Sequence, residues 1–141
     1  MTTEENEAIV RRFFDEVCNG RQLDVADELF APDHAYHDPQ IPGVQPGPEG
    51  MKQVIATYQQ AFPDAHWEVV EMFSTGDRVV TRWIGSGTHG AELMGIVPTG
   101  MKVRVAGHWI HHIEGGRIVE SWNVWDVLGM LQQLGVVPPP E

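Results

Sequence analysis

Histidines and carboxylates are the residues of this 141-residue chain whose types and spacing could do chemistry. Of its seven histidines, His108, His111 and His112 share one apolar segment, and His37 precedes Asp38 in a proline-rich segment. An imidazole that titrates near neutral pH is the usual general acid or base, and a nearby carboxylate can orient it or act itself. The pattern therefore favours an acid/base site.

Two carboxylates, Glu120 and Asp126, lie in the aromatic segment that follows the histidine triplet. Each also has a structural interpretation. Asp126 directly precedes a helical pattern and could be its N-cap. Glu120 could form an ion pair with a strand neighbour such as Arg104. The sequence leaves both alternatives open.

Two histidines and a carboxylate can also hold iron or zinc, so a metal site is the competing use of these residues. Neither His108 with His112 nor His34 with His37 has a specific ligand spacing, and no CxxC or HExxH motif occurs. We expect no metal. The chain also lacks a GxSxG motif, and its single cysteine, Cys18, is expected in the core.

The first half of the chain has helical periodicity. Apolar residues predict a helix over 4–18, capped by Thr2, and a short helix over about 24–30. Segment 31–48 holds five prolines and is predicted to be an ordered loop. Pro48 begins a helix that continues to Phe62.

The second half of the chain has the pattern of β-strands. It predicts strands over 65–73, 78–87, 102–113 and 117–127 and a short helix over 127–134. Helices that precede strands indicate the α+β class with an antiparallel sheet. The Gly-rich connection 85–100 is expected to form a mouth loop over a pocket. We expect one domain over 1–141, of which 136–141 is a mobile tail.

A two-residue turn at Gly115-Gly116 predicts the faces of the last hairpin. One face carries Trp109, His111, Glu120 and Trp122, and the other carries His108, Ile110, His112, Asn123 and Trp125. Large aromatics on both faces indicate that both are covered, one by helices and a pocket and the other by a second subunit. A homodimer through the sheet is expected, and a one-residue bulge would exchange the two face assignments.

The composition excludes some partners. Nine Lys and Arg against twenty Asp and Glu give a net charge of -11, which repels nucleic acid and anionic membrane surfaces. No segment has the length of a membrane span or the pattern of a signal peptide. We therefore expect a cytoplasmic protein that binds neither nucleic acid nor membrane.

The sequence resembles the SnoaL-like polyketide cyclases of the nuclear-transport-factor-2-like superfamily. Four features carry the resemblance, in order along the chain: the helices, the His37-Asp38-Pro39 loop, the segment RWIGSGTHGAELMGIVPTGMKV and the segment GGRIVESWNVWDVLGMLQQLG. The resemblance covers nearly the whole chain. It implies a cone, in which a curved antiparallel sheet is wrapped by three N-terminal helices, and it implies dimers formed through the sheet.

The resemblance also implies an activity, the intramolecular aldol closure of a ring on a small hydrophobic carbonyl substrate, without metal or organic cofactor. Asp126 matches the position of the family's acid/base residue, and His37 and His112 are the expected partners, with His108 as the substitute for His112. The expected pocket residues are Trp83, Trp109, Trp122, Glu120, Phe62, His89 and His108. A non-catalytic binding module and an accessory dimer are the alternatives on the same fold.

Overall fold

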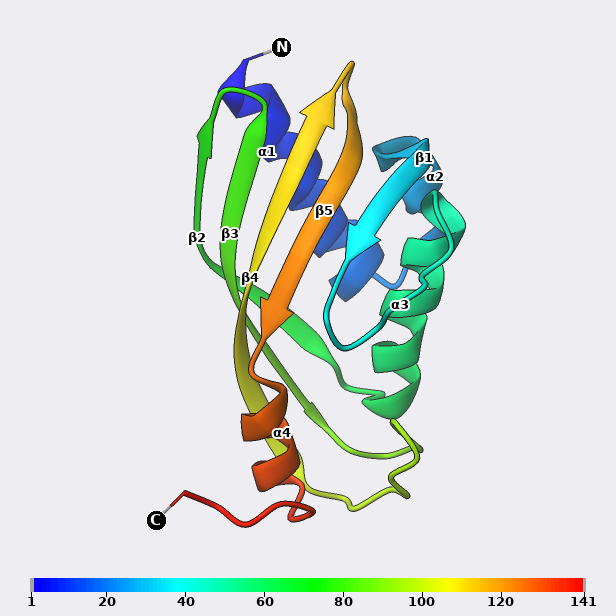
Figure 1. The fold of residues 1–141 in the computed structure, drawn as a ribbon, viewed down its shortest axis with the longest axis vertical. Coiled ribbons are helices and arrows are strands. Elements are labelled where there is room, and N and C mark those ends of the chain that lie inside the picture. The colour runs from blue at the N-terminus through cyan, green and yellow to red at the C-terminus, as the bar shows by residue number, and fades with distance from the viewer. Residues whose placement is uncertain (1, 141) are drawn as a thin grey trace.

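Five strands form one curved sheet in the computed structural model, which describes residues 2–140 (Figure 1). Their order across the sheet is β1-β5-β4-β3-β2. Strands β2 to β5 pair antiparallel, whereas β1 pairs parallel with β5. The strands are β1 (Phe30–His37), β2 (His66–Thr75), β3 (Arg78–Thr88), β4 (Lys102–Glu114) and β5 (Arg117–Trp125).

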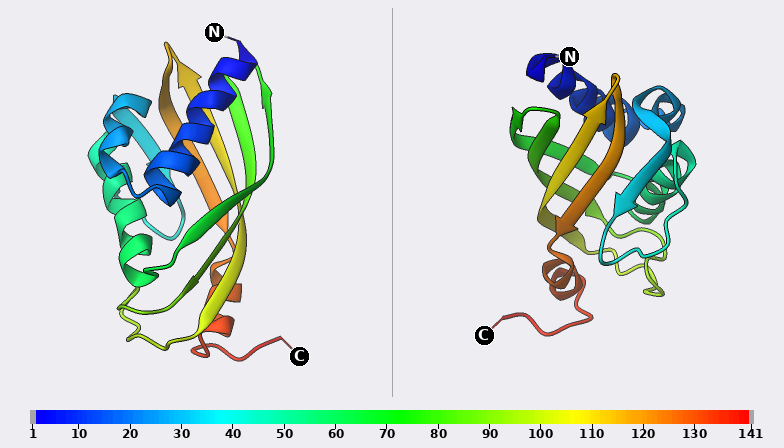
Figure 2. Two further views of the ribbon diagram at one scale, coloured as in Figure 1. Left: turned by 180° about the vertical axis from the view of Figure 1, so that it is seen from behind. Right: turned by 45° about the horizontal axis from the view of Figure 1, so that its top comes forward.

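The helices cover one face of this sheet and its lower end (Figures 1 and 2). Helix α1 crosses the covered face and α3 lies beside it, while α4 follows β5 at the lower end. The helices are α1 (Thr3–Arg12), continued by the π-helix Phe13–Asn19, then the 3₁₀ turn Leu23–Val25, α2 (Ala26–Leu29), α3 (Pro48–Ala61) and α4 (Val127–Gln133). The predicted α+β cone with three N-terminal helices is confirmed.

Local chemistry explains where the helices begin. The Thr2 hydroxyl accepts a hydrogen bond from Glu5 N at 3.1 Å, which satisfies one free amide of the first turn of α1. Pro48 occupies the start of α3, where its missing N–H costs nothing. None of the described helices combines the length and apolar character needed to cross a membrane. Residues 136–140 form no helix or strand, and the outermost residues of the predicted domain, 1 and 141, lie outside the described part.

The predictions of a loop over 31–48 and of a wholly antiparallel sheet are corrected by strand β1, which occupies the first part of that segment and pairs parallel with β5. It includes Pro32, which cannot donate a ladder hydrogen bond, and its pairing register with β5 shifts between Phe30 and Ala35. An edge strand tolerates both irregularities because only one of its sides is paired.

The faces predicted for the last hairpin are wrong for β5, and the bulge alternative is confirmed. Glu114 pairs with Arg117 and Ile113 with Ile118, but His112 then pairs with Glu120, so Val119 is an extra residue. The bulge reverses the alternation along β5. As a result Ser121, Asn123 and Trp125 share the inner face with Trp109 and His111, and Glu120, Trp122 and Val124 share the outer face with His108, Ile110 and His112.

Two histidines are buried in the core beneath the helices. His34 Nε2 lies 2.8 Å from Ser121 Oγ, and His111 stacks on Trp109 with ring centroids 4.9 Å apart. Neither ring nitrogen of His111 has a hydrogen-bond partner among residues 2–140. Burial lowers the pKa of His34 to about 4 and that of His111 to about 3, so both rings are neutral in the native protein at pH 7.

This burial predicts that the protein loses stability as the pH falls below 6.5. The unfolded chain takes up protons on these histidines near pH 6.5, whereas the folded chain takes them up only at the lower pKa values, so acid favours unfolding. Between pH 7.5 and 5 each histidine should cost about 2 kcal/mol. Urea denaturation of wild type and His111→Phe at both pH values checks this, with His108→Gln as the control that removes an exposed histidine from the same strand. An unchanged pH dependence in His111→Phe would contradict it.

Candidate active site

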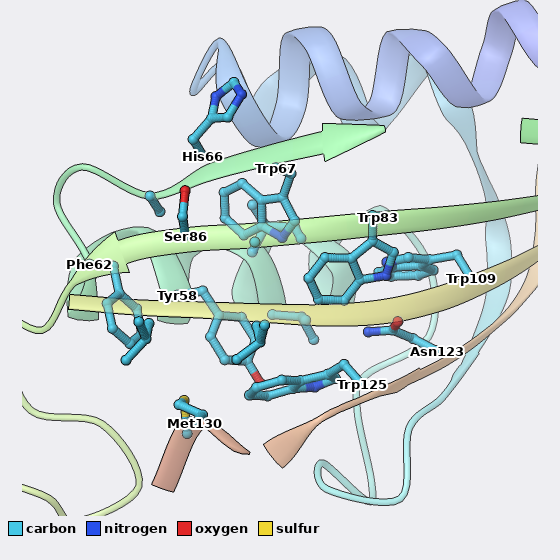
Figure 3. A pocket seen from close by; sticks show the side chains of 16 residues that line it. Tyr58, Phe62, His66, Trp67, Trp83, Ser86, Trp109, Asn123, Trp125 and Met130 are labelled. Atoms are coloured by element: carbon cyan, nitrogen blue, oxygen red, sulfur yellow. The ribbon is translucent and has the colours of Figure 1, made fainter. Parts of the chain in front are cut away.

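An apolar cavity lies between the inner face of the sheet and α3 (Figure 3). Strands β2 to β5 and α3 each contribute side chains to it, and Phe62 and Met130 line it at the end nearer α4. Its aromatic lining includes Trp67, Trp83, Trp109 and Trp125. The cavity volume is about 60 Å³, smaller than the ~150 Å³ void that admits one benzene ring. A ring-sized ligand therefore has to displace part of this lining.

The position of Trp83 depends on a glycine in the neighbouring strand. A Cβ atom on Gly107 would lie 2.4 Å from the Trp83 ring and 2.7 Å from Trp125 Cβ. Only a residue without a side chain leaves this space, so Gly107 lets the indole lie flat against β4. The glycine thus determines the shape of the cavity wall.

Three buried polar atoms interrupt the apolar lining, and the exposed residues His66 and Ser86 also line the cavity. The Tyr58 hydroxyl, Trp83 Nε1 and Asn123 Oδ1 are all buried, and none has a hydrogen-bond partner within the described chain. Figure 3 shows the Asn123 amide between Trp109 and Trp125. A buried polar group without a partner costs free energy, so three on one cavity favour a bound water or ligand that supplies the missing partners. Tyr58 and Trp83 offer donors, and Asn123 offers an acceptor.

A chain of hydrogen bonds connects Asn123 to a buried carboxylate. Asn123 Nδ2 donates to the Tyr36 hydroxyl at 3.2 Å, and that hydroxyl donates to Asp38 Oδ2 at 2.7 Å. The other carboxylate oxygen of Asp38 accepts the backbone N–H of Gln40 at 2.9 Å. Burial is the main cause that raises the pKa of Tyr36, so its phenol keeps its proton at neutral pH.

A second hollow, open to solvent and with a volume of about 430 Å³, lies on the other side of Asn123. The end of β1, the loop that follows it and the outer part of β5 form its walls. They contribute Tyr36, His37, Asp38, Ile41, Trp122 and Val124. Asn123 borders both spaces, so the polar chain separates the internal cavity from this outer hollow.

Comparison with known proteins identifies the family. The model of the SnoaL-like polyketide cyclases matches residues 8–134. The chain belongs to this family. It is 31% identical to the aklanonic acid methyl ester cyclase DnrD of Streptomyces peucetius, over 94% of this chain and 93% of that protein.

Solved structures agree. IdmH from Streptomyces antibioticus, a candidate polyketide cyclase, is 34% identical, covers 92% of this chain and 98% of its own, and superposes with a TM-score of 0.78. TsrD from Streptomyces laurentii, at 24% identity and a TM-score of 0.87 over 97% and 99% of the two chains, supports the fold alone. The family predicted from the sequence, and with it a cyclase-like enzyme, is confirmed.

The SnoaL-like cavity contains some of the predicted pocket residues and excludes others. Trp83, Trp109 and Phe62 line it as expected. His89 is buried behind Phe62, where its Nδ1 accepts the backbone N–H of Thr99 at 3.2 Å. It thus anchors the connection between β3 and β4, and residues 89–101 of this connection, expected to form a mouth loop, are not among the residues that line the cavity. His108 is exposed on the outer face of β4, because the strand alternates from the inward-facing Trp109.

His37, Glu120 and Trp122 gather outside the cavity. His37 Nε2 lies 2.6 Å from Glu120 Oε2, and its ring stacks on Trp122 at 5.4 Å. Glu120 therefore has a side-chain partner, as its structural alternative predicted, but this partner is His37 and not Arg104. The Val119 bulge places Glu120 and Trp122 on the outer face, so the expected pocket positions of both are corrected.

His112 lies at the far end of β4, on the outer face. Its Nε2 is 2.8 Å from Asp77 and 3.3 Å from Glu114, and hydrogen bonding to His112 lowers the pKa of Asp77. Ligand atoms of these three residues lie within 4.8 Å of one another, the one such group among residues 2–140. Because His112 Nε2 already lies beside two exposed carboxylates, we interpret the group as a polar cluster on the protein surface.

Asp126 lies outside the cavity lining. Its Oδ1 accepts the backbone N–H of Gly129 at 2.8 Å and caps α4, and its side chain is exposed. In the structure Asp126 is the N-cap of α4, which was the alternative to an acid/base role. The three residues expected to act together, Asp126, His37 and His112, lie apart and have different partners.

The sequence did not single out the polar residues that the structure brings together, namely Asn123, Tyr36, Tyr58 and Asp38. Asn123 was placed on the wrong face because the bulge was not resolved. Tyr58 lies within the helix predicted from Pro48 to Phe62, and nothing in that pattern sets it apart. Tyr36 and Asp38 lie in the predicted loop, where the sequence pattern names Asp38 only as the neighbour of His37. A polar residue at an inward position of a strand is the signal that could have identified Asn123.

The cap assignment predicts how Asp126 responds to substitution. Asp126→Ala should lower the free energy of unfolding by about 1 kcal/mol, because one amide of the first turn of α4 loses its acceptor. Asp126→Asn should keep most of that stability, since asparagine caps equally well. Urea denaturation and turnover of both variants test this. A stable Asp126→Asn protein without activity would restore Asp126 as an acid/base residue.

Proposed function

We propose that this protein catalyses a cofactor-independent, aldol-type ring closure on a small hydrophobic carbonyl substrate of the polyketide class, bound in the internal cavity. One observation carries the proposal: three buried polar atoms that have no hydrogen-bond partner among the described residues line a mostly apolar cavity in a member of a cyclase family. Such a cavity suits a ligand that is mostly apolar and has a few oxygen atoms at fixed places.

The three groups have the chemistry that an aldol closure needs. In this reaction the carbon of an enol bonds to a ketone carbon, the enol oxygen loses its proton, and the ketone oxygen gains one. Donors from Tyr58 and Trp83 can stabilise the negative charge that develops on the ketone oxygen. The Asn123 carbonyl can accept the enol hydroxyl. Atoms and protons balance within the substrate, so the product is an isomer.

The relatives suggest which substrate to test first. DnrD, and DauD of Streptomyces sp. strain C5, at 31% and 30% identity, are named as aklanonic acid methyl ester cyclases. Incubation with this ester should give a product of equal mass and different chromatographic retention. Addition of EDTA should leave the rate unchanged. Loss of activity with EDTA would contradict cofactor independence.

A non-catalytic binding module is the second candidate, and one observation favours it: no carboxylate is among the described residues that line the cavity. The two functions differ in one measurement. A binding module would bind apolar carbonyl compounds and return them unchanged, whereas a cyclase would convert at least one of them to its isomer.

Substitution of Tyr58 tests the role of the cavity donors. Tyr58→Phe should raise the stability of the free protein by about 1 kcal/mol, because an unpaired buried hydroxyl is removed. The same variant should lower kcat on the order of 100-fold, as expected for the loss of one oxyanion donor. Thermal unfolding and steady-state kinetics provide the two readouts. A fall in stability with unchanged kcat would indicate a structural hydroxyl.

We also propose that two copies associate through the outer face of the sheet. Phe73, Val80, Ile110 and Trp122 are paired neighbours that form one apolar row across β2 to β5. Val124 lies beside this row with 62% of its surface exposed. A continuous apolar row on an open sheet face is typical of an interface.

The dimer is tested with a matched pair of substitutions. Val124→Glu places a charge beside the row and should shift sedimentation from dimer to monomer. Val136→Glu makes the same change at an exposed valine beyond α4 and should leave the dimer intact. Wild-type protein that sediments as a monomer at micromolar concentration would refute this proposal.

A further inference from the structure

We propose that Asp38 is a positioning residue that determines specificity: acting through Tyr36, it holds the Asn123 amide so that its oxygen remains for the ligand, and the site selects compounds that present a hydroxyl or enol hydrogen there. This inference rests on the proposed use of the internal cavity as the substrate site.

The direction of the hydrogen-bond chain follows from Asp38. A carboxylate only accepts hydrogen bonds, so the Tyr36 hydroxyl has to donate its single proton to Asp38 Oδ2, at 2.7 Å. The Tyr36 oxygen then has only lone pairs to offer to Asn123. Asn123 must therefore face Tyr36 with its NH₂ group, at 3.2 Å, and Oδ1 is left without a partner.

Burial and packing around the three residues favour this direction of the hydrogen bonds. Asp38 is 7% exposed and Asn123 is 6% exposed, so water competes little for either group. Tyr36 packs against Trp109 with ring centroids 5.4 Å apart, and this contact holds the phenol in place between Asp38 and Asn123. Through these hydrogen bonds, Asp38 determines that the group on the cavity wall is an acceptor, the Asn123 oxygen.

The backbone of Gln40 determines what a substitution of Asp38 should do. Gln40 N donates to Asp38 Oδ1 at 2.9 Å. In Asp38→Asn the side-chain oxygen has to stay on this N–H, which turns the new NH₂ group toward Tyr36. Tyr36 then accepts from residue 38 and donates to Asn123, so the Asn123 amide rotates and presents NH₂ to the cavity.

The orientation of the Asn123 amide determines whether the site prefers a ligand that donates a hydrogen bond or one that accepts it. With Oδ1 available, the site should prefer a donor such as the enol of a β-dicarbonyl compound. With NH₂ available, it should prefer an acceptor such as a ketone or ether. The probes are 2-naphthol, whose hydroxyl can donate, and 2-methoxynaphthalene, whose ether oxygen can only accept and which is larger by one methyl group.

The first measurement is NMR of the Asn123 side-chain amide in the ligand-free protein. In wild type, its amide protons should give NOEs to the Tyr36 ring, and in Asp38→Asn these should weaken while NOEs to the cavity tryptophans appear. Asp33→Asn is the matched control, because it makes the same change at an exposed position of β1. Unchanged NOEs in Asp38→Asn would overturn the inference.

The second measurement is the affinity of both probes by calorimetric titration. Wild type and Asp33→Asn should prefer 2-naphthol by roughly three- to tenfold, the effect of one neutral hydrogen bond, and Asp38→Asn should lose or reverse this preference. If Asp38→Asn does not fold, Tyr36→Phe replaces it and should bring the ratio close to one. An unchanged ratio in a variant that binds both probes refutes the role of Asp38 and leaves the proposed function standing. Wild type that binds neither probe and converts no substrate refutes the proposed function, and the NOEs still decide the orientation.

Discussion

The bulge at Val119 is the constraint on which the rest of the site depends. It adds one residue to β5 opposite the regular pairs of β4, and every later side chain of β5 changes face. Ser121 and Asn123 turn toward the helices, where His34 and Tyr36 reach them. Without the bulge, Glu120 and Trp122 would face inward and a carboxylate would enter the core.

The site carries a cost in stability that the fold has to offset. Buried groups without partners at Tyr58, Trp83 and Asn123 are each unfavourable in the free protein. The adjacent core is dense and aromatic, with edge-to-face contacts of Phe13 to Phe30 at 5.5 Å and to Trp109 at 5.3 Å. Such packing holds the walls of the cavity so that its polar atoms do not turn away to find partners.

Much of this fold could be predicted from the sequence because its periodicities are strong. The apolar stripes of α1 and α3 and the β-rich runs of β2 to β5 define their elements without tertiary information. Strand β1 could not be found this way, since Pro32 and the polar residues after it resemble a loop, and only the pairing with β5 orders them.

The site was harder to predict than the fold, and for a physical reason. Asp126 attracted notice as a charged residue within a family motif, but a carboxylate one residue before a helix already has a local partner in Gly129 N. Asn123 carries no charge, and its importance depends on the bulge four residues earlier in the strand. Sequence patterns identify the type of a residue more readily than the face on which a bulge places it.

The absence of a carboxylate from the described cavity lining restricts the chemistry of the cavity itself. The buried groups of Tyr58, Trp83 and Asn123 stabilise charge that the substrate develops, but they do not remove a proton from an unactivated carbon. The one imidazole among the described lining residues belongs to the exposed His66. A β-dicarbonyl compound already exists partly as its enol, so ring closure requires orientation and charge stabilisation more than a strong base. The polar chain from Asp38 to Asn123 is suited to this task, because it presents one oriented acceptor inside an apolar wall and keeps the carboxylate itself outside. The geometry thus favours substrates that bring their own acidic hydrogen.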